Sequence, residues 1–234
     1  LANQIVIAAS TRNPERRAAA ETRLAAADRH ARLHALVRRL DHGYSPVRIY
    51  AAEKILALGE RGAVGALVRR CVREPNRNVR RHLTAVLRAF DEPETAALFV
   101  RHLADPEPAH RFRTLQNLGV FRDRRVVPVL VRRLRLLASG FPQAAASFTT
   151  ERAYIRGWRL ISGGTGNQVV EVPDPEIDVL RTGVRLEVRV RLVEIQLTVE
   201  LLRDLTGQRL GAEPAAWERW LAEHPDAPLA PPAP

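Results

Sequence analysis

The stretch Ala35-Leu36-Val37-Arg38-Arg39-Leu40 decides the fold, because the chain contains four versions of it. The other three are Ala66–Cys71, Leu98–Leu103 and Val129–Leu134, and the second residues of successive versions are 31, 32 and 31 positions apart. Each version places apolar residues around two adjacent basic positions, which is the pattern of an amphipathic helix. A fixed period of this length is typical of stacked helical repeats, in which each unit buries its apolar face against its neighbours. We call the stretch the repeat hexapeptide.

A second helical segment precedes each version of the repeat hexapeptide. Its expected starts are Asn13-Pro14, Ser45-Pro46, Asn76-Arg77-Asn78 and Asp105-Pro106-Glu107-Pro108, where polar residues and prolines suit a helix entrance. Its expected ends are Gly59, Phe90-Asp91 and Leu118-Gly119. Each unit is therefore predicted to be a first helix, a short turn and a second helix that carries the hexapeptide. Four such units span residues 10–138.

These units resemble HEAT repeats. The resemblance depends on Pro46-Val47-Arg48 at the start of a first helix, an alanine-rich body and Leu58-Gly59 at its end. The period near 31 residues is similar to that of bacterial HEAT repeats of the phycobilin-lyase type. The resemblance implies a mainly α protein, an α-α superhelix, in which the second helices line the concave side. It implies a binding surface more than it implies any activity.

The character of the sequence changes after the fourth hexapeptide. Residues 154–161 and 168–172 favour two strands, separated by a glycine-rich turn, and Val184–Val190 alternates strictly between apolar and charged residues. Alternation with period two predicts a half-buried strand. We therefore expect a small antiparallel β-sheet, inserted near the C-terminus over residues 150–191.

Helical periodicity then returns, with Leu192, Ile195, Val199 and Leu202 on one stripe. A last helix begins at Pro214 and carries Trp217 and Trp220. We expect residues 192–224 to be capping helices that close the stack, with the two tryptophans buried rather than forming an exposed binding patch. Five prolines in residues 225–234 predict a disordered tail.

Composition and charge narrow the possible functions. The chain has 234 residues and a net charge of +11, and no stretch is apolar enough to span a membrane. Residues 1–140 carry 26 arginines and one lysine against 13 acidic residues, a balance of +14. Residues 1–9 lack the features of a signal peptide, which favours a soluble cytoplasmic protein. The sequence starts at Leu1 and contains no methionine, so export through an upstream segment remains an alternative.

No catalytic or metal-binding signature is present in the sequence. Cys71 occupies a position that is leucine in the other hexapeptides, which predicts a small buried hydrophobe rather than a reactive thiol. His30 and His34 have the spacing of a zinc pair, but no third ligand is nearby. The glycines at 163–166 lack the Lys-Ser/Thr of a phosphate-binding loop. We expect a protein that is not an enzyme and that needs no cofactor or metal.

The basic pairs of the hexapeptides are the candidate site. They are Arg38 and Arg39, Arg69 and Arg70, Arg101 and His102, and Arg132 and Arg133. Because stacked units lie roughly 10 Å apart, these pairs should form a ladder along the second helices. A row of guanidinium groups suits carboxylates or phosphates, although it can also be a solvated face that binds nothing. We therefore expect a non-catalytic scaffold or adaptor that binds an anionic partner protein through its basic concave face.

Two other functions are compatible with the same repeats. One is nucleic-acid binding, as in the HEAT-like alkylpurine DNA glycosylases, which hold a damaged nucleotide with aromatic and acidic residues. No tryptophan precedes Trp158 and the second helices carry few acidic residues, which argues against that activity. The other is a chromophore lyase subunit, which only the repeat resemblance supports.

Overall fold

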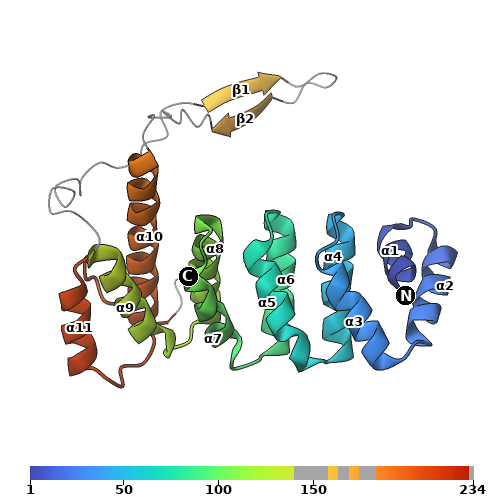
Figure 1. Cartoon of the computed structure of the whole chain (residues 1–234), viewed down its shortest axis with the longest axis horizontal. Coiled ribbons are helices and arrows are strands. Elements are labelled where there is room, and N and C mark those ends of the chain that lie inside the picture. The colour runs from blue at the N-terminus through green and yellow to red at the C-terminus, as the bar shows by residue number, and fades with distance from the viewer. Residues whose placement is uncertain (140–157, 163–168, 174–182, 232–234) are drawn as a thin grey trace.

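A computed structural model describes residues 1–139, 158–162, 169–173 and 183–231. In this part of the chain, helices stack side by side along the long axis of the molecule (Figure 1). From the N-terminus they are α1 (Ala2–Ser10), α2 (Pro14–Ala25), α3 (Arg29–Arg39), α4 (Ser45–Leu58), η1 (Arg61–Ala63), α5 (Val64–Arg73), α6 (Arg77–Phe90), α7 (Thr95–Val100), η2 (Arg101–Ala104), α8 (Pro108–Phe121), α9 (Val126–Ser139), α10 (Gly183–Thr206) and α11 (Pro214–Glu223). The arrangement is the predicted helical solenoid.

The helices form two layers. The hexapeptide helices α3, α5, α7 and α9 lie in one layer, and α4, α6, α8 and α10 lie in the other. Each hexapeptide helix packs most closely against the helix that follows it, so that the pairs are α3 with α4, α5 with α6, α7 with α8 and α9 with α10. We expected the hexapeptide helix to be the second member of its pair. The structure makes it the first, because its apolar face covers the next helix along the chain.

Local signals in the sequence account for most helix ends. The side chains of Asn13 and Asn76 accept backbone N–H groups of the first turns of α2 and α6, as predicted. Gly59 ends α4 with φ of 67°, a left-handed conformation that glycine adopts without steric cost. Two expectations were wrong. The residue before α4 is Tyr44 rather than Ser45, and α8 continues through Gly119 to a left-handed cap at Arg122.

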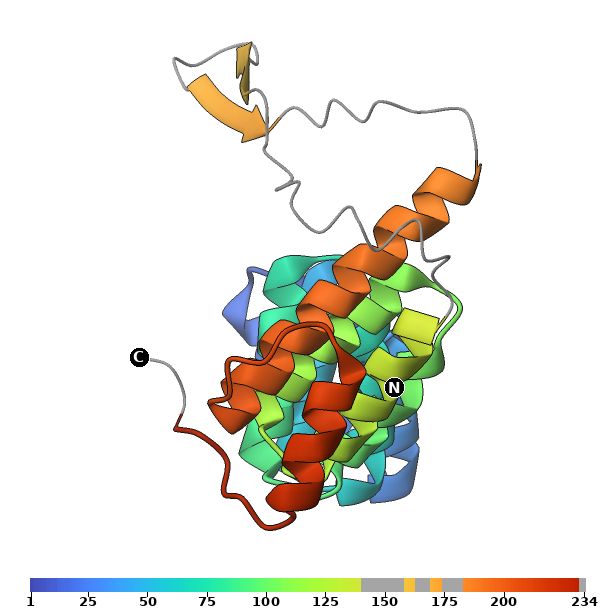
Figure 2. The same cartoon turned by 90° about the vertical axis from the view of Figure 1, so that its left-hand side faces the viewer.

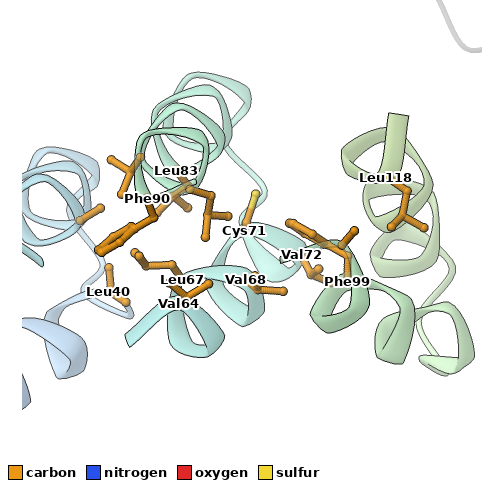
Figure 3. Packing of buried hydrophobic residues seen from close by; sticks show 14 of the residues in the cluster. Leu40, Val64, Leu67, Val68, Cys71, Val72, Leu83, Phe90, Phe99 and Leu118 are labelled. Atoms are coloured by element: carbon orange, nitrogen blue, oxygen red, sulfur yellow. The ribbon is translucent and has the colours of Figure 1, made fainter. Parts of the chain in front are cut away.

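The core is a continuous aliphatic cluster that runs through the stack. Figure 3 shows its centre, where Leu67 and Cys71 of α5 lie beside Leu83 and Phe90 of α6, with Phe99 of α7 on the other side. All five side chains are buried. The same hexapeptide position supplies Leu36, Leu67, Phe99 and Leu130, each with at most 1% of its surface exposed. The apolar periodicity of the hexapeptides is thus what joins neighbouring units.

The predicted β-sheet insertion is wrong, and the fold is that of a helical solenoid without a sheet layer. Val184–Val190, predicted as a strand, lies in α10. This stretch forms helix rather than strand because it continues a helix whose later residues Val199 and Leu202 are buried in the core. Adding residues to the end of an existing helix costs little free energy. Among the described residues, the strands β1 (Trp158–Ser162) and β2 (Val169–Pro173) pair with each other and with no further strand. They stand apart from the helices in both views (Figures 1 and 2).

The end of the stack is closed by α11, which packs against α9. Trp217 is completely buried, and its indole N–H donates to the carbonyl oxygen of Gly211 over 2.8 Å. The proline-rich end, predicted to be disordered, contacts the helices through Leu229 and Ala230. The backbone N–H of Ala230 donates to the carbonyl oxygen of Leu205, and Leu229 packs against the core.

Candidate functional site

The two positions of each basic pair have different environments. Successive residues of a helix point about 100° apart, so the two side chains of a pair cannot share one orientation. The first residues of the pairs are all exposed: Arg38, Arg69, Arg101 and Arg132. The second residues are all partly buried: Arg39, Arg70, His102 and Arg133. The predicted ladder of eight residues therefore separates into an outer row and an inner row.

The outer row consists of Arg38, Arg69, Arg101 and Arg132. These residues occupy the same position in four successive units, on α3, α5, η2 and α9. None of them forms a hydrogen bond or ion pair with another residue in the described part of the chain. Each guanidinium group thus keeps its donors available to an external ligand.

The inner row is largely engaged within the protein. Arg70 pairs with Glu74 at 2.7 Å and with Asp41 at 3.2 Å, and its side chain is only 14% exposed. Arg133 forms an ion pair with Glu194. His102 lies 3.9 Å from Asp105. Arg39 differs from the other three, because no partner is found for it among the described residues and its Nε atom is shielded from solvent.

Glu74 is the carboxylate that joins α4 to α5, the two helices of the second repeat unit. Its side chain is fully buried and accepts hydrogen bonds from Arg48 at 2.7 and 2.9 Å, from Arg70 at 2.7 and 3.1 Å, and from the backbone N–H of Asn76 at 2.9 Å. Burial works against ionisation of Glu74, but these hydrogen bonds outweigh burial, and the pKa of Glu74 lies below its ordinary value. Arg48 and Arg70 therefore enclose a buried carboxylate anion.

Glu194 has the same role in the fourth unit, although it comes from α10. It accepts from Arg111 at 2.8 Å and from Arg133, and its side chain is 1% exposed. Arg111 and Arg133 correspond in the repeat to Arg48 and Arg70. Two arginines and one buried carboxylate thus recur in both units, although Glu194 lies far along the chain from both of its partners.

The third unit has a histidine, His102, at the position of Arg70 and Arg133. Asp105 lies 3.0 Å from the Nδ1 atom of His110 and also faces His102. Burial lowers the pKa of His102, and the positive charges of Arg73 and Arg69 lower it further, while Asp105 acts in the opposite direction. Asp105 itself has a lowered pKa, because hydrogen bonds from the Glu107 N–H and from His110 outweigh its burial. His102 and Asp105 therefore both bind protons less readily in the folded protein than ordinary side chains of their kinds.

The sequence also offered a cysteine, a histidine pair and a glycine-rich stretch as candidates. Cys71 is buried, and burial raises the pKa of its thiol. His30 and His34 are exposed, and the described residues contain no group of three or more potential metal ligands. The glycines at 163–166 lie outside the described residues. Among the described helices, none has the length and apolar content needed to cross a bilayer.

Comparison with known families agrees with the repeat geometry. Residues 64–146 match the model of the HEAT repeats, and the match starts at the first residue of α5. No curated protein matches the chain. HEAT repeats in general suggest a protein-interaction scaffold, typically without catalytic activity. The match carries no information on a bacterial source or on the phycobilin-lyase type. The stacked helices and the matched segment together support HEAT repeats over residues 64–146.

Proposed function

We propose that this protein is a non-catalytic scaffold that binds an acidic partner protein through the outer row. The observation that carries the proposal is the difference between the two rows. Inner-row residues in three units have acidic partners within the protein. The outer-row arginines are exposed in all four units and have no partner among the described residues.

Charge and geometry support an extended anionic ligand. Stacked helices bring equivalent residues to roughly 10 Å from one another, a spacing that several acidic side chains on one protein surface can match. Residues 1–140 have a balance of +14, so the row lies in a strongly positive part of the chain. Such a field accelerates association with an acidic protein and favours it over other partners.

A charge-reversal experiment tests the proposal. The variant Arg69→Glu/Arg101→Glu changes two members of the outer row. The matched control is Arg81→Glu/Arg88→Glu on α6, which has the same change in net charge at two exposed positions of the other layer. Circular dichroism should show that both variants fold like the wild type. Affinity capture from a nuclease-treated lysate of the source organism should recover an acidic protein with the wild type and the control, but not with the outer-row variant.

Salt dependence separates this function from nucleic-acid binding. A complex dominated by phosphate contacts would lose roughly 10³-fold or more in affinity between about 50 and 200 mM salt. An interface with an apolar centre and a charged rim depends on salt much less. If both variants retained the partner, or if the partner were captured only from a lysate without nuclease treatment, the proposed function would be wrong.

A further inference from the structure

The turns between paired helices share one hydrogen-bonding device. In the α3–α4, α5–α6 and α7–α8 turns, an arginine in the first turn of the second helix reaches back to two backbone carbonyl groups, six and five residues earlier. Arg48 donates to His42 at 2.8 Å and Gly43 at 2.9 Å, Arg80 to Glu74 at 2.9 Å and Pro75 at 2.6 Å, and Arg111 to Asp105 at 2.8 Å and Pro106 at 3.0 Å. This contact places His42, Glu74 and Asp105 at equivalent positions of three turns.

A second contact gives the same alignment. The side chain at this position accepts the backbone N–H two residues later in every case: His42 from Tyr44 at 3.1 Å, Glu74 from Asn76 at 2.9 Å and Asp105 from Glu107 at 3.0 Å. Glu74 and Asp105 also face the inner-row residue of their own unit, which is Arg70 or His102. In the first unit the equivalent residue is His42, which supplies no carboxylate.

Arg39 is therefore the inner-row residue whose acidic partner is missing from its turn. Its Nε atom is shielded from solvent and has no hydrogen-bond partner. The adjacent acidic residue, Asp41, pairs with Arg70 of the next unit instead. A guanidinium N–H that is removed from water without a partner costs free energy, which a carboxylate at the right place would recover.

We propose that Arg39 receives an aspartate or glutamate side chain from the acidic partner, which provides the carboxylate that Glu74 and Asp105 provide in their own units. This inference rests on the proposed function and adds to it one defined contact, between Arg39 and a carboxylate of the partner. A carboxylate is favoured over a phosphate because the two equivalent turns both present carboxylates to the inner row. The outer row then orients the partner, and Arg39 anchors one of its acidic residues.

The test follows the side-chain Nε–H signals of the arginines by ¹H–¹⁵N NMR while a short poly-glutamate peptide is added to the full-length protein. An Arg39→Gln variant assigns the Arg39 signal by its loss. The Arg39 signal should move together with those of Arg38 and Arg69. A poly-glutamine peptide, which carries no carboxylates, should move none of these three signals.

Replacing His42 with aspartate places a carboxylate within the protein at the position of Glu74 and Asp105. In His42→Asp the Arg39 signal should be displaced before any peptide is added, and the affinity for poly-glutamate should fall roughly tenfold, as for the loss of one charge-assisted hydrogen bond. The control His82→Asp, at an exposed histidine of α6, has the same change in charge and should bind like the wild type.

The possible results distinguish this inference from the proposed function. If the outer-row signals move and the Arg39 signal does not, or if His42→Asp binds the peptide like the wild type, the contact at Arg39 is wrong while the proposed function stands. If poly-glutamate moves neither row, the proposed function is wrong. If a short oligothymidylate moves the Arg39 signal and poly-glutamate does not, the ligand is a phosphate, and the inference is overturned.

Discussion

Replacing Glu74 with glutamine should cause a large loss of stability. The Glu74 side chain is completely buried and accepts two hydrogen bonds from Arg48, two from Arg70 and one from the Asn76 N–H. In Glu74→Gln the shape is kept, but the charge is lost and an amide NH2 group points at guanidinium donors. Removal of one partner from a buried ion pair costs about 3–5 kcal/mol. For a chain of this size, this corresponds to a decrease in Tm on the order of 10 °C.

Urea denaturation followed by circular dichroism at 222 nm measures this loss. The matched control is Glu94→Gln, the same substitution in an ion pair with Arg125 whose two side chains are 61% and 59% exposed. An exposed pair contributes roughly 1 kcal/mol or less, so the control should unfold close to the wild type. If Glu74→Gln and Glu94→Gln unfolded at the same urea concentration, the buried carboxylate would not hold the second unit together.

Three further results are expected. Lowered pKa values of Glu74, Asp105 and His102 mean that the folded state binds fewer protons than the unfolded state. These three groups should therefore contribute fully to stability above pH 6.5, the ordinary pKa of His102. Below that pH, stability should fall first through the range of His102 and then through that of the carboxylates. Urea midpoints that stay unchanged from about pH 7 to 4 would contradict this. Trp217→Ala should lower the free energy of unfolding by about 3–5 kcal/mol, because it empties a fully buried site that also holds an indole hydrogen bond; a loss below about 1 kcal/mol in urea denaturation would show that α11 does not close the stack. Cys71 should react with a thiol reagent only after denaturant is added, since burial both shields the thiol and raises its pKa; rapid modification of the folded protein would refute this.

The sequence is sufficient to predict the helical repeats, because the signals for them are local and occur several times. Apolar residues at helical spacing predict which side chains are buried, and the residues at the equivalent position from Leu36 to Leu130 are all in the core. The error at Val184–Val190 has a physical reason. A short alternating pattern places its apolar residues on one face only if the stretch is a strand, and it does not by itself exclude a helix. The packing of the later part of α10 decides between helix and strand.

The separation of the basic pairs into two rows could have been predicted in part. Glu74 and Asp105 follow their inner-row partners Arg70 and His102 by four and three residues, a spacing at which side chains of a helix meet. Acidic residues at this spacing predict that Arg70 and His102 have acidic partners within the protein. The same spacing does not identify Glu194, because its contact with Arg133 depends on the stacking of α10 rather than on spacing along the chain.

The origin of Glu194 also determines when the parts of the protein can form during synthesis. The ribosome has already produced every residue of the Arg48, Arg70 and Glu74 group once α5 and its exit turn have emerged. Arg111 and Arg133 emerge long before α10, so their shared carboxylate arrives late. A nascent chain that stops before residue 183 therefore has a complete second unit, but in its fourth unit it has two arginines without their common anion.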